Sequence, residues 1–151
     1  MRREWDRSSP VAQFQVLAHA QSNGRSDDGT TRYLFGGLEI WLRPLASAPA
    51  TTLELYWAGA LRLGRGEGSA GMQTLVNFAD RAGVALLLYA DPWGQRPRMA
   101  RDALRRWYER FGFEASAEHL VAYWPCRLGL EMRRDPRCHC IMAMSNALNI
   151  G

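Results

Sequence analysis

The sequence contains no lysine, so all nineteen of its basic residues are arginine. This absence excludes a Walker A loop, whose lysine must reach the terminal phosphates of a nucleotide. The formal net charge is +4 and the isoelectric point is near 9.3. This balance favours anionic partners, but it does not by itself indicate nucleic-acid binding. A GC-rich genome is the simplest explanation for a chain that uses arginine alone.

Long hydrophobic runs are also missing. No apolar segment approaches the ~20 residues that a transmembrane helix needs. The first ten residues, MRREWDRSSP, lack the apolar core of a signal peptide. We therefore expect a cytoplasmic protein that does not use a membrane as a partner.

Cysteine is scarce, and the three cysteines form an odd number, which argues against a framework of disulfides. Cys138 and Cys140 flank a histidine, so a zinc site completed by Cys126 is one interpretation. Paired zinc ligands are usually separated by two to four residues so that both reach one ion, and these lie closer together. We therefore expect free thiols in the C-terminal tail and no bound metal.

The length and composition predict a single domain. The chain has 151 residues, of which 47% are hydrophobic and 23% are charged. A chain of this size buries roughly 70% of the surface that it exposes when unfolded. For the first half the pattern predicts a strand over 14–20, an exposed loop over 21–31, a hairpin or bulged strand over 32–45 and a connector over 46–50.

The second half alternates between strands and helices. We expect a strand over 51–61, then a helix, a buried strand over 84–90, a helix over 100–111 and closing strands over 119–124 and 128–132. The helix between the first two strands must return the chain to the same edge, so these strands are predicted to be parallel.

The strand over 51–61 is predicted to have one polar face. Its alternation turns Leu53, Leu55 and Trp57 one way and turns Glu54 and Tyr56 the other way.

Four glycines fall within residues 62–71, RLGRGEGSAG, between this strand and the following helix. We expect Ser69 to cap the helix and Gly83 to end it. Glycines at a helix start let bare backbone N–H groups approach a phosphate closely. A tight strand-to-helix turn without a ligand is the alternative, although it explains one or two glycines better than four.

A dinucleotide-binding fold is a second interpretation of the same glycines. Gly66, Gly68 and Gly71 fit the pattern G-x-G-x-x-G, and Asp91 would then be the acidic residue that binds a ribose. The second half of such a fold is missing, and the glycine pattern alone is weak evidence.

A third pattern is more specific. Residues 65–70, RGEGSA, fit R/Q-x-x-G-x-G/A, and residues 105–114, RRWYERFGFE, contain an aromatic-Tyr-Glu-x-x-Gly-Phe run. Separated by one strand and one helix, the two motifs resemble the acyl-CoA signature and the fourth helix of the GCN5-related N-acetyltransferases, the GNAT family. The resemblance covers residues 51 to about 136, within one domain of residues 1–151, and leaves residues 137–151 as a tail.

This resemblance implies an α/β fold with a mixed, mostly antiparallel sheet, a splayed parallel strand pair and helices on both faces. It also implies an N-acyltransferase that uses acetyl-CoA as a co-substrate, in which a primary amine attacks the thioester directly in a ternary complex. The glycine-turn amides would hold the pyrophosphate, and the pantetheine arm would lie between the splayed strands. The CoA-binding residues implied in this way are Leu61, Leu63, Arg65, Gly66, Glu67, Gly68, Ser69, Ala70 and Arg101.

Two catalytic roles follow from the resemblance and the pattern together. Tyr108 matches the family tyrosine that protonates the leaving thiolate, and a phenol with a pKa near 10 is a reasonable acid for a thiolate of about 8.5 or higher. The alternative is that Tyr108 is a core aromatic residue. Glu54, on the polar face of its strand, is the candidate base for the amine, or else an ordinary exposed glutamate. Glu39 and His119 are weaker candidates.

The acceptor is not defined by the sequence. The two N-terminal helices that build the acceptor site in the family have no clear counterpart here. Ser69 stands where an aliphatic residue is frequent, and Arg101 stands where asparagine is common. The amine acceptor is therefore a small molecule, a protein or an aminoacyl-tRNA, and a homodimer is compatible with the fold.

Arginines cluster around the helix over 100–111. They can form a solvated surface, reach the phosphates of CoA or dock an acidic acceptor; they are Arg96, Arg98, Arg101, Arg105, Arg106 and Arg110. Two competing functions stay open. One is a catalytically silent GNAT-like module that binds CoA or a protein. The other is a nucleic-acid-binding protein, whose affinity would fall steeply with salt.

Overall fold

A computed structural model describes residues 9–45, 51–60, 66–92, 100–123 and 127–137. Some predictions concern residues outside these ranges. They are the connector over 46–50, the CoA contacts of Leu61, Leu63 and Arg65, the arginines Arg96 and Arg98, and the cysteines Cys126, Cys138 and Cys140.

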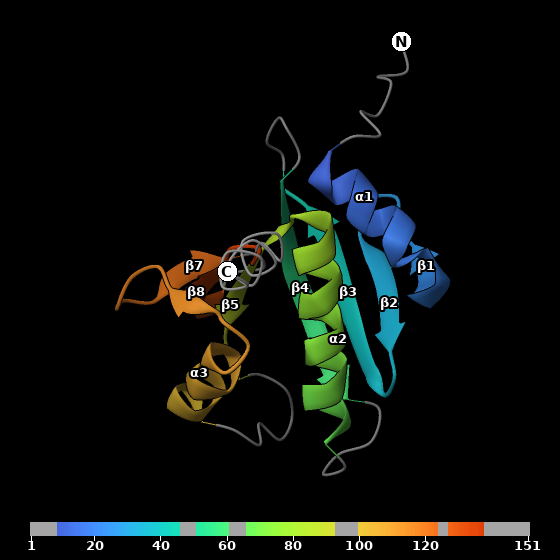
Figure 1. The fold of residues 1–151 in the computed structure, drawn as a ribbon. Helices are drawn as coiled ribbons and strands as arrows, with labels where there is room; N and C mark the ends of the chain where they lie inside the picture. The colour runs from blue at the N-terminus through green and yellow to red at the C-terminus, as the bar shows by residue number, and fades with distance from the viewer. Residues whose placement is uncertain (1–8, 46–50, 61–65, 93–99, 124–126, 138–151) are drawn as a thin grey trace, which may run out of the picture.

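The described strands form one mixed sheet (Figure 1). In spatial order they are β1 (Ser22–Arg25), β2 (Thr31–Phe35), β3 (Leu38–Pro44), β4 (Thr52–Ala60), β5 (Ala85–Ala90), β8 (Arg127–Arg134) and β6 (Glu114–Ala115), with β7 (Val121–Tyr123) paired to β8. Among these strands β4 and β5 are parallel, and the other neighbouring pairs are antiparallel. The mixed sheet and its parallel pair confirm the prediction.

The N-terminal segment differs from the prediction. Residues 14–20 were expected to form a strand, but α1 (Pro10–Leu17) and a 3-10 turn, η1 (His19–Gln21), occupy this region. The Ser9 side chain caps α1 by accepting a hydrogen bond from the Ala12 N–H at 3.1 Å, and Pro10 suits the first helical position. The expected loop over 21–31 contains β1, whose four residues are all exposed, so its burial pattern gave no strand signal.

Helix α2 (Glu67–Ala82) crosses from β4 to β5. It begins one turn earlier than predicted, because Gly66 rather than Ser69 is the N-cap residue, with φ of 70°. The predicted stop at Gly83 is confirmed, with φ of 74°. Helix α3 (Arg101–Glu109) lies within the predicted helix over 100–111, and a turn ending at Gly112, where φ is 93°, follows it. No described helix is both long and apolar enough to span a membrane.

The described helices contact one face of the sheet. Phe14 of α1 packs edge-on against Tyr33 of β2 and Phe78 of α2. Helix α3 reaches the same side, because the Nε1 of Trp107 donates a hydrogen bond to the Ser69 hydroxyl of α2 at 3.1 Å. We expected helices on both faces. Within the described part of the chain the second face stays open, because the segment after α1 forms β1 and a turn rather than another helix.

Gly71 allows α2 to approach the β2–β3 hairpin. A Cβ added there would lie 2.7 Å from the carbonyl oxygen of Phe35 and would overlap the Leu38 side chain. We expect Gly71→Ala to lower the free energy of unfolding by about 1–3 kcal/mol, because overpacking outweighs the better helix propensity of alanine. Urea denaturation measures the change. Gln73→Ala on the exposed side of α2 is the control, and equal midpoints for the two variants would contradict the packing argument.

Candidate functional site

The parallel pair β4–β5 opens into a wedge. The two strands pair at three positions, Thr52 with Ala85, Leu53 with Leu86 and Glu54 with Leu87. Beyond these three paired positions, β4 continues to Ala60 and pairs with β3, whereas β5 continues to Ala90 and pairs with β8. The backbone groups that face the wedge therefore have no strand partner among the described residues. Unpaired N–H and C=O groups inside a sheet need another partner, such as a ligand or water.

A bulge in β4 changes which side chains face the open side. Trp41 of β3 is opposite Trp57 and Leu42 is opposite Leu55, so Tyr56 is the extra residue. Trp57 was expected to face the core beside Leu55. Instead Trp41 contacts both aromatic residues, with ring centroids 6.3 Å from Tyr56 and 5.3 Å from Trp57. The bulge thus places two consecutive aromatic side chains on the open face.

Helix α2 is the next described element after β4, and it begins at Glu67. Gly66 adopts a left-handed conformation, and a Cβ there would meet no atom within 4 Å, so the space above the turn is open. The Ala70 N–H donates to the Gly66 carbonyl at 3.1 Å, which is the first turn of the helix. The amides of Glu67, Gly68 and Ser69 precede that bond, so they have no acceptor within the helix. These amides and the helix dipole favour an anion here.

Tyr108 of α3 lies on the helical side of the sheet. Its side chain packs against Trp107 and Phe113, with ring centroids 5.0 and 5.6 Å away, and Tyr108 is 9% exposed. Burial, with a smaller contribution from the neighbouring Tyr123 phenol, raises the pKa of Tyr108 to about 12. Its hydroxyl therefore stays protonated at neutral pH and can act only as a proton donor there.

Glu54 lies at the apex of the wedge, on the open face. Its carboxylate accepts hydrogen bonds from Arg43 Nε at 2.7 Å and from Arg43 Nη2 at 3.3 Å, and Glu54 is 8% exposed. The hydrogen bond from Arg43 to Glu54 is also the main reason that the pKa of Arg43 is raised. Glu54 is thus a buried, paired carboxylate rather than an exposed one.

The weaker base candidates are placed elsewhere. The Glu39 carboxylate accepts a hydrogen bond from the Trp41 indole at 2.9 Å. His119 is exposed in the segment between β6 and β7.

A cluster of ionic side chains lies at the C-terminal end of β5. From the sequence, its central residue, Asp91, was considered only as a ribose ligand. Asp91 accepts hydrogen bonds from Tyr123 and Arg127, both at 2.6 Å, and Arg101 Nη2 lies 3.9 Å away. Burial alone would raise the pKa of Asp91, but the hydrogen bonds from Arg127 and Tyr123 outweigh it, and the pKa falls below its ordinary value. A polar residue at the end of a buried strand was the available signal.

Asp91→Asn tests this cluster. We expect the variant to lose about 2 kcal/mol of stability at neutral pH, because hydrogen bonds from charged groups weaken. The folded pKa is lowered, so the stabilisation is fully present above about pH 4 and is lost as the pH falls through the lower folded value. Urea midpoints of both proteins should therefore converge as the pH falls below the lowered folded pKa, and a difference that is constant over the whole acidic range would contradict this account.

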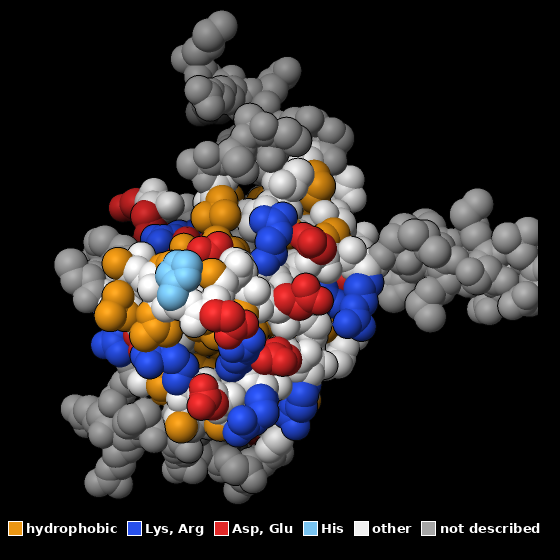
Figure 2. Space-filling model, turned by 90° about the vertical axis from the view of Figure 1, so that its left-hand side faces the viewer, with side chains coloured by type: hydrophobic (Ala, Val, Ile, Leu, Met, Phe, Trp, Pro, Cys, Tyr) orange, Lys and Arg blue, Asp and Glu red, His pale blue; other side chains and the backbone are white. Residues whose placement is uncertain are grey.

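Arginines in and directly after α3 make polar contacts with neighbouring side chains. Arg105 donates to Glu109 at 2.9 Å and to Glu118 at 3.1 Å, and Arg110 lies 3.4 Å from the Ser69 hydroxyl. Figure 2 shows basic and acidic side chains interspersed over this side of the molecule rather than one basic patch. This distribution favours a solvated surface over a nucleic-acid interface. No cluster suited to a metal ion occurs among the described residues.

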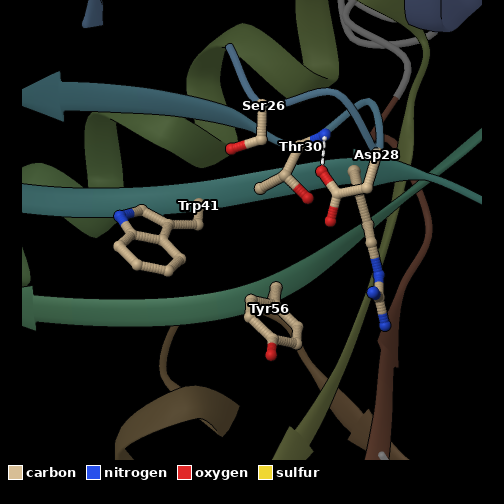
Figure 3. Close-up of a pocket in the computed structure, with 6 residues that line it drawn as sticks. Ser26, Asp28, Thr30, Trp41 and Tyr56 are labelled. Carbon is tan, nitrogen blue, oxygen red and sulfur yellow. Dashed lines mark hydrogen bonds between the residues drawn. The ribbon is translucent and has the colours of Figure 1, made fainter. Parts of the chain in front are cut away.

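A pocket on the open face was also missed, because its lining comes from separate segments of the chain. It holds about 390 Å³ and is lined by Ser26, Asp28, Thr30, Trp41, Arg43 and Tyr56 (Figure 3). No local motif in the sequence joins the turn after β1 to β3 and β4.

The fold is similar to that of solved structures. A protein assigned as a phosphinothricin N-acetyltransferase superposes with a TM-score of 0.50 at 14% identity, covering 91% of this chain and 95% of that one. The anti-CRISPR protein AcrVA5 superposes with a TM-score of 0.50 at 18% identity, covering 70% of this chain and 97% of that one. No family model and no curated protein matches the sequence. The likeness establishes the GNAT-like fold and leaves the activity to be argued from the site.

Proposed function

We propose that this chain, which has a GNAT-like fold, transfers an acyl group from acyl-coenzyme A, in the first instance acetyl-CoA, to a primary amine. The observation that carries this proposal is the wedge between β4 and β5, where backbone groups in the middle of a sheet lack a strand partner. An extended amide-containing arm such as pantetheine can supply the missing hydrogen bonds.

The residues around the wedge fit a CoA thioester. The amides of Glu67, Gly68 and Ser69 would bind the pyrophosphate, and the open space above Gly66 leaves room for it. The backbone of β4 would bind the pantetheine arm. We keep Leu61, Leu63, Arg65, Ala70 and Arg101 as further proposed contacts, the last through its side chain at the start of α3.

Two side chains on opposite sides of the sheet would move the protons of the reaction. Glu54 on the open face would accept the proton that the amine loses as the new C–N bond forms. Tyr108 on the helical side would donate its proton to the thiolate as the C–S bond breaks. The burial that raises the pKa of Tyr108 would also raise the pKa of a thiol beside it, so the pKa values of the acid and of the leaving thiol would stay close to each other.

Calorimetric titration with acetyl-CoA, and with CoA, ATP and NAD as comparisons, tests the proposal. We expect micromolar binding of acetyl-CoA and CoA and no binding of ATP or NAD. Release of the CoA thiol in the presence of a panel of amines then measures turnover. Absence of binding to all four compounds would contradict the proposal and would leave the glycine turn as a structural feature.

A catalytically silent module is the second candidate function. The ion pair between Arg43 and Glu54 favours it, because both carboxylate oxygens of Glu54 already accept hydrogen bonds from the guanidinium. Such a module would bind acetyl-CoA in the same titration but would release no CoA with any amine.

A further inference from the structure

The pocket on the open face adjoins the proposed reaction centre. Arg43 lines the pocket and is ion-paired with Glu54 at 2.7 Å, and its guanidinium also lies 4.7 Å from the ring centroid of Tyr56. A molecule in the pocket therefore lies beside the guanidinium that is paired with Glu54, the carboxylate at the apex of the wedge. The volume of about 390 Å³ suits a small molecule.

The charge of the pocket is uneven. The positive charge of Arg43 is compensated by its ion pair with Glu54. Asp28 makes no ion pair within the described residues. Its carboxylate accepts a hydrogen bond from the Thr30 N–H at 3.0 Å, and this interaction is the main reason that its pKa lies below the ordinary value (Figure 3). Asp28 is thus an ionised carboxylate at the rim of the pocket. The positive charge of Arg43 also acts on it, but Glu54 compensates that charge, so the three groups together keep one net negative charge that favours a cation.

One wall of the pocket is aromatic. Trp41 and Tyr56 lie nearly parallel, with an interplanar angle of 16°, and Figure 3 shows both rings beside the space that Ser26 and Thr30 border from the other side. Hydrocarbon packs well on such rings, and cations are attracted to their faces.

We propose that this pocket binds the acceptor, and that the acceptor is a small diamine with one ammonium group on Asp28 and the other amino group directed towards Glu54. This inference rests on the proposed function. An ammonium has no lone pair, so the amine held by Asp28 is not the nucleophile, and a second amino group must react. That second amine gives its proton to Glu54, its nitrogen bonds to the acyl carbon, and the thiolate leaves with the Tyr108 proton.

The test compares straight-chain α,ω-diamines of about four to six carbons with the monoamines of equal length, using CoA release as the assay. We expect kcat/KM to be about tenfold higher for the diamine, because its second ammonium forms a charge-assisted hydrogen bond. Asp28→Asn should reduce the diamine to the level of the monoamine and leave the KM for acetyl-CoA unchanged. Asparagine keeps an oxygen for the Thr30 N–H, so the turn is retained. Asp27→Asn, an exposed neighbour outside the pocket, should change neither substrate.

Each outcome decides the proposal. Equal kcat/KM for diamine and monoamine, or no effect of Asp28→Asn, would overturn it. Transfer to amino acids or a lysine peptide but not to diamines would overturn the diamine pocket and uphold the proposed function. Calorimetric binding of the diamine without acetyl-CoA, lost in Asp28→Asn, would uphold the pocket even if acetyl-CoA failed to bind and the proposed function fell.

Discussion

Tyr108→Phe is expected to lower kcat by roughly 100- to 10,000-fold and to leave the affinity for acetyl-CoA unchanged, because the phenol supplies only a proton to the leaving thiolate. Phenylalanine keeps the ring contacts with Trp107 and Phe113, so the core should stay intact. The phenol, with its pKa raised to about 12, stays protonated in ordinary assay buffers. No fall in kcat that depends on Tyr108 is therefore expected from about pH 7 to about pH 9.

The matched control is Tyr33→Phe. Tyr33 is a second buried tyrosine on the helical side, 2% exposed, and burial raises its pKa as well. It lies on β2, away from the wedge, so its hydroxyl should not affect kcat. A Tyr108→Phe enzyme with the same kcat as the Tyr33→Phe enzyme would make Tyr108 a core aromatic residue. CoA binding without turnover in the wild-type chain would favour the silent module.

The second large effect is expected on stability. Arg134 of β8 and Asp80 of α2 form a buried pair, with Nη1 2.7 Å from Oδ1 and Nη2 3.0 Å from Oδ2. Arg134 Nε also donates to the Phe111 carbonyl at 2.7 Å, which links the pair to the turn after α3. Asp80→Ala leaves the guanidinium buried without its carboxylate, and we expect a loss of about 3–5 kcal/mol in the free energy of unfolding.

A double-mutant cycle separates the pair from general packing. Replacing both partners, Asp80→Ala with Arg134→Met, should cost less than the sum of the two single changes, because no uncompensated charge remains. Arg133→Met provides a comparison, since Arg133 pairs with Asp135 at the surface, and surface pairs contribute less than about 1 kcal/mol. Urea denaturation of the four proteins gives the coupling free energy. Additive losses would show that the pair has no special role.

The second half of the chain could be predicted because local signals agree with the tertiary structure there. The apolar stripe of α2 ends at Gly83, β5 is a continuous apolar run, and both are placed as expected. The parallel pairing of β4 and β5 followed from the crossover helix alone, since a helix between two strands returns the chain to the same edge.

The errors arise where tertiary contacts override local patterns. The first helix was missed because only two of its residues, Val11 and Phe14, are buried, and the cap at Ser9 precedes a short segment. The orientation of Trp57 was wrong because one extra residue in β4 reverses the alternation after Tyr56, and pairing with β3 decides where that residue lies. The roles predicted for Glu54 and Tyr108 remain predictions, although the surroundings of both side chains are now described.

The short ladder between β4 and β5 divides the sheet into two halves. One half contains β1 to β4, the other contains β5 to β8, and three paired positions connect them together with α2. Because the halves diverge from Glu54 onward, a small rotation about the short ladder becomes a larger displacement near Ala60 and Ala90. A molecule that bonds to both halves would therefore hold them together, and the free energy of unfolding would rise with the affinity of the chain for that molecule.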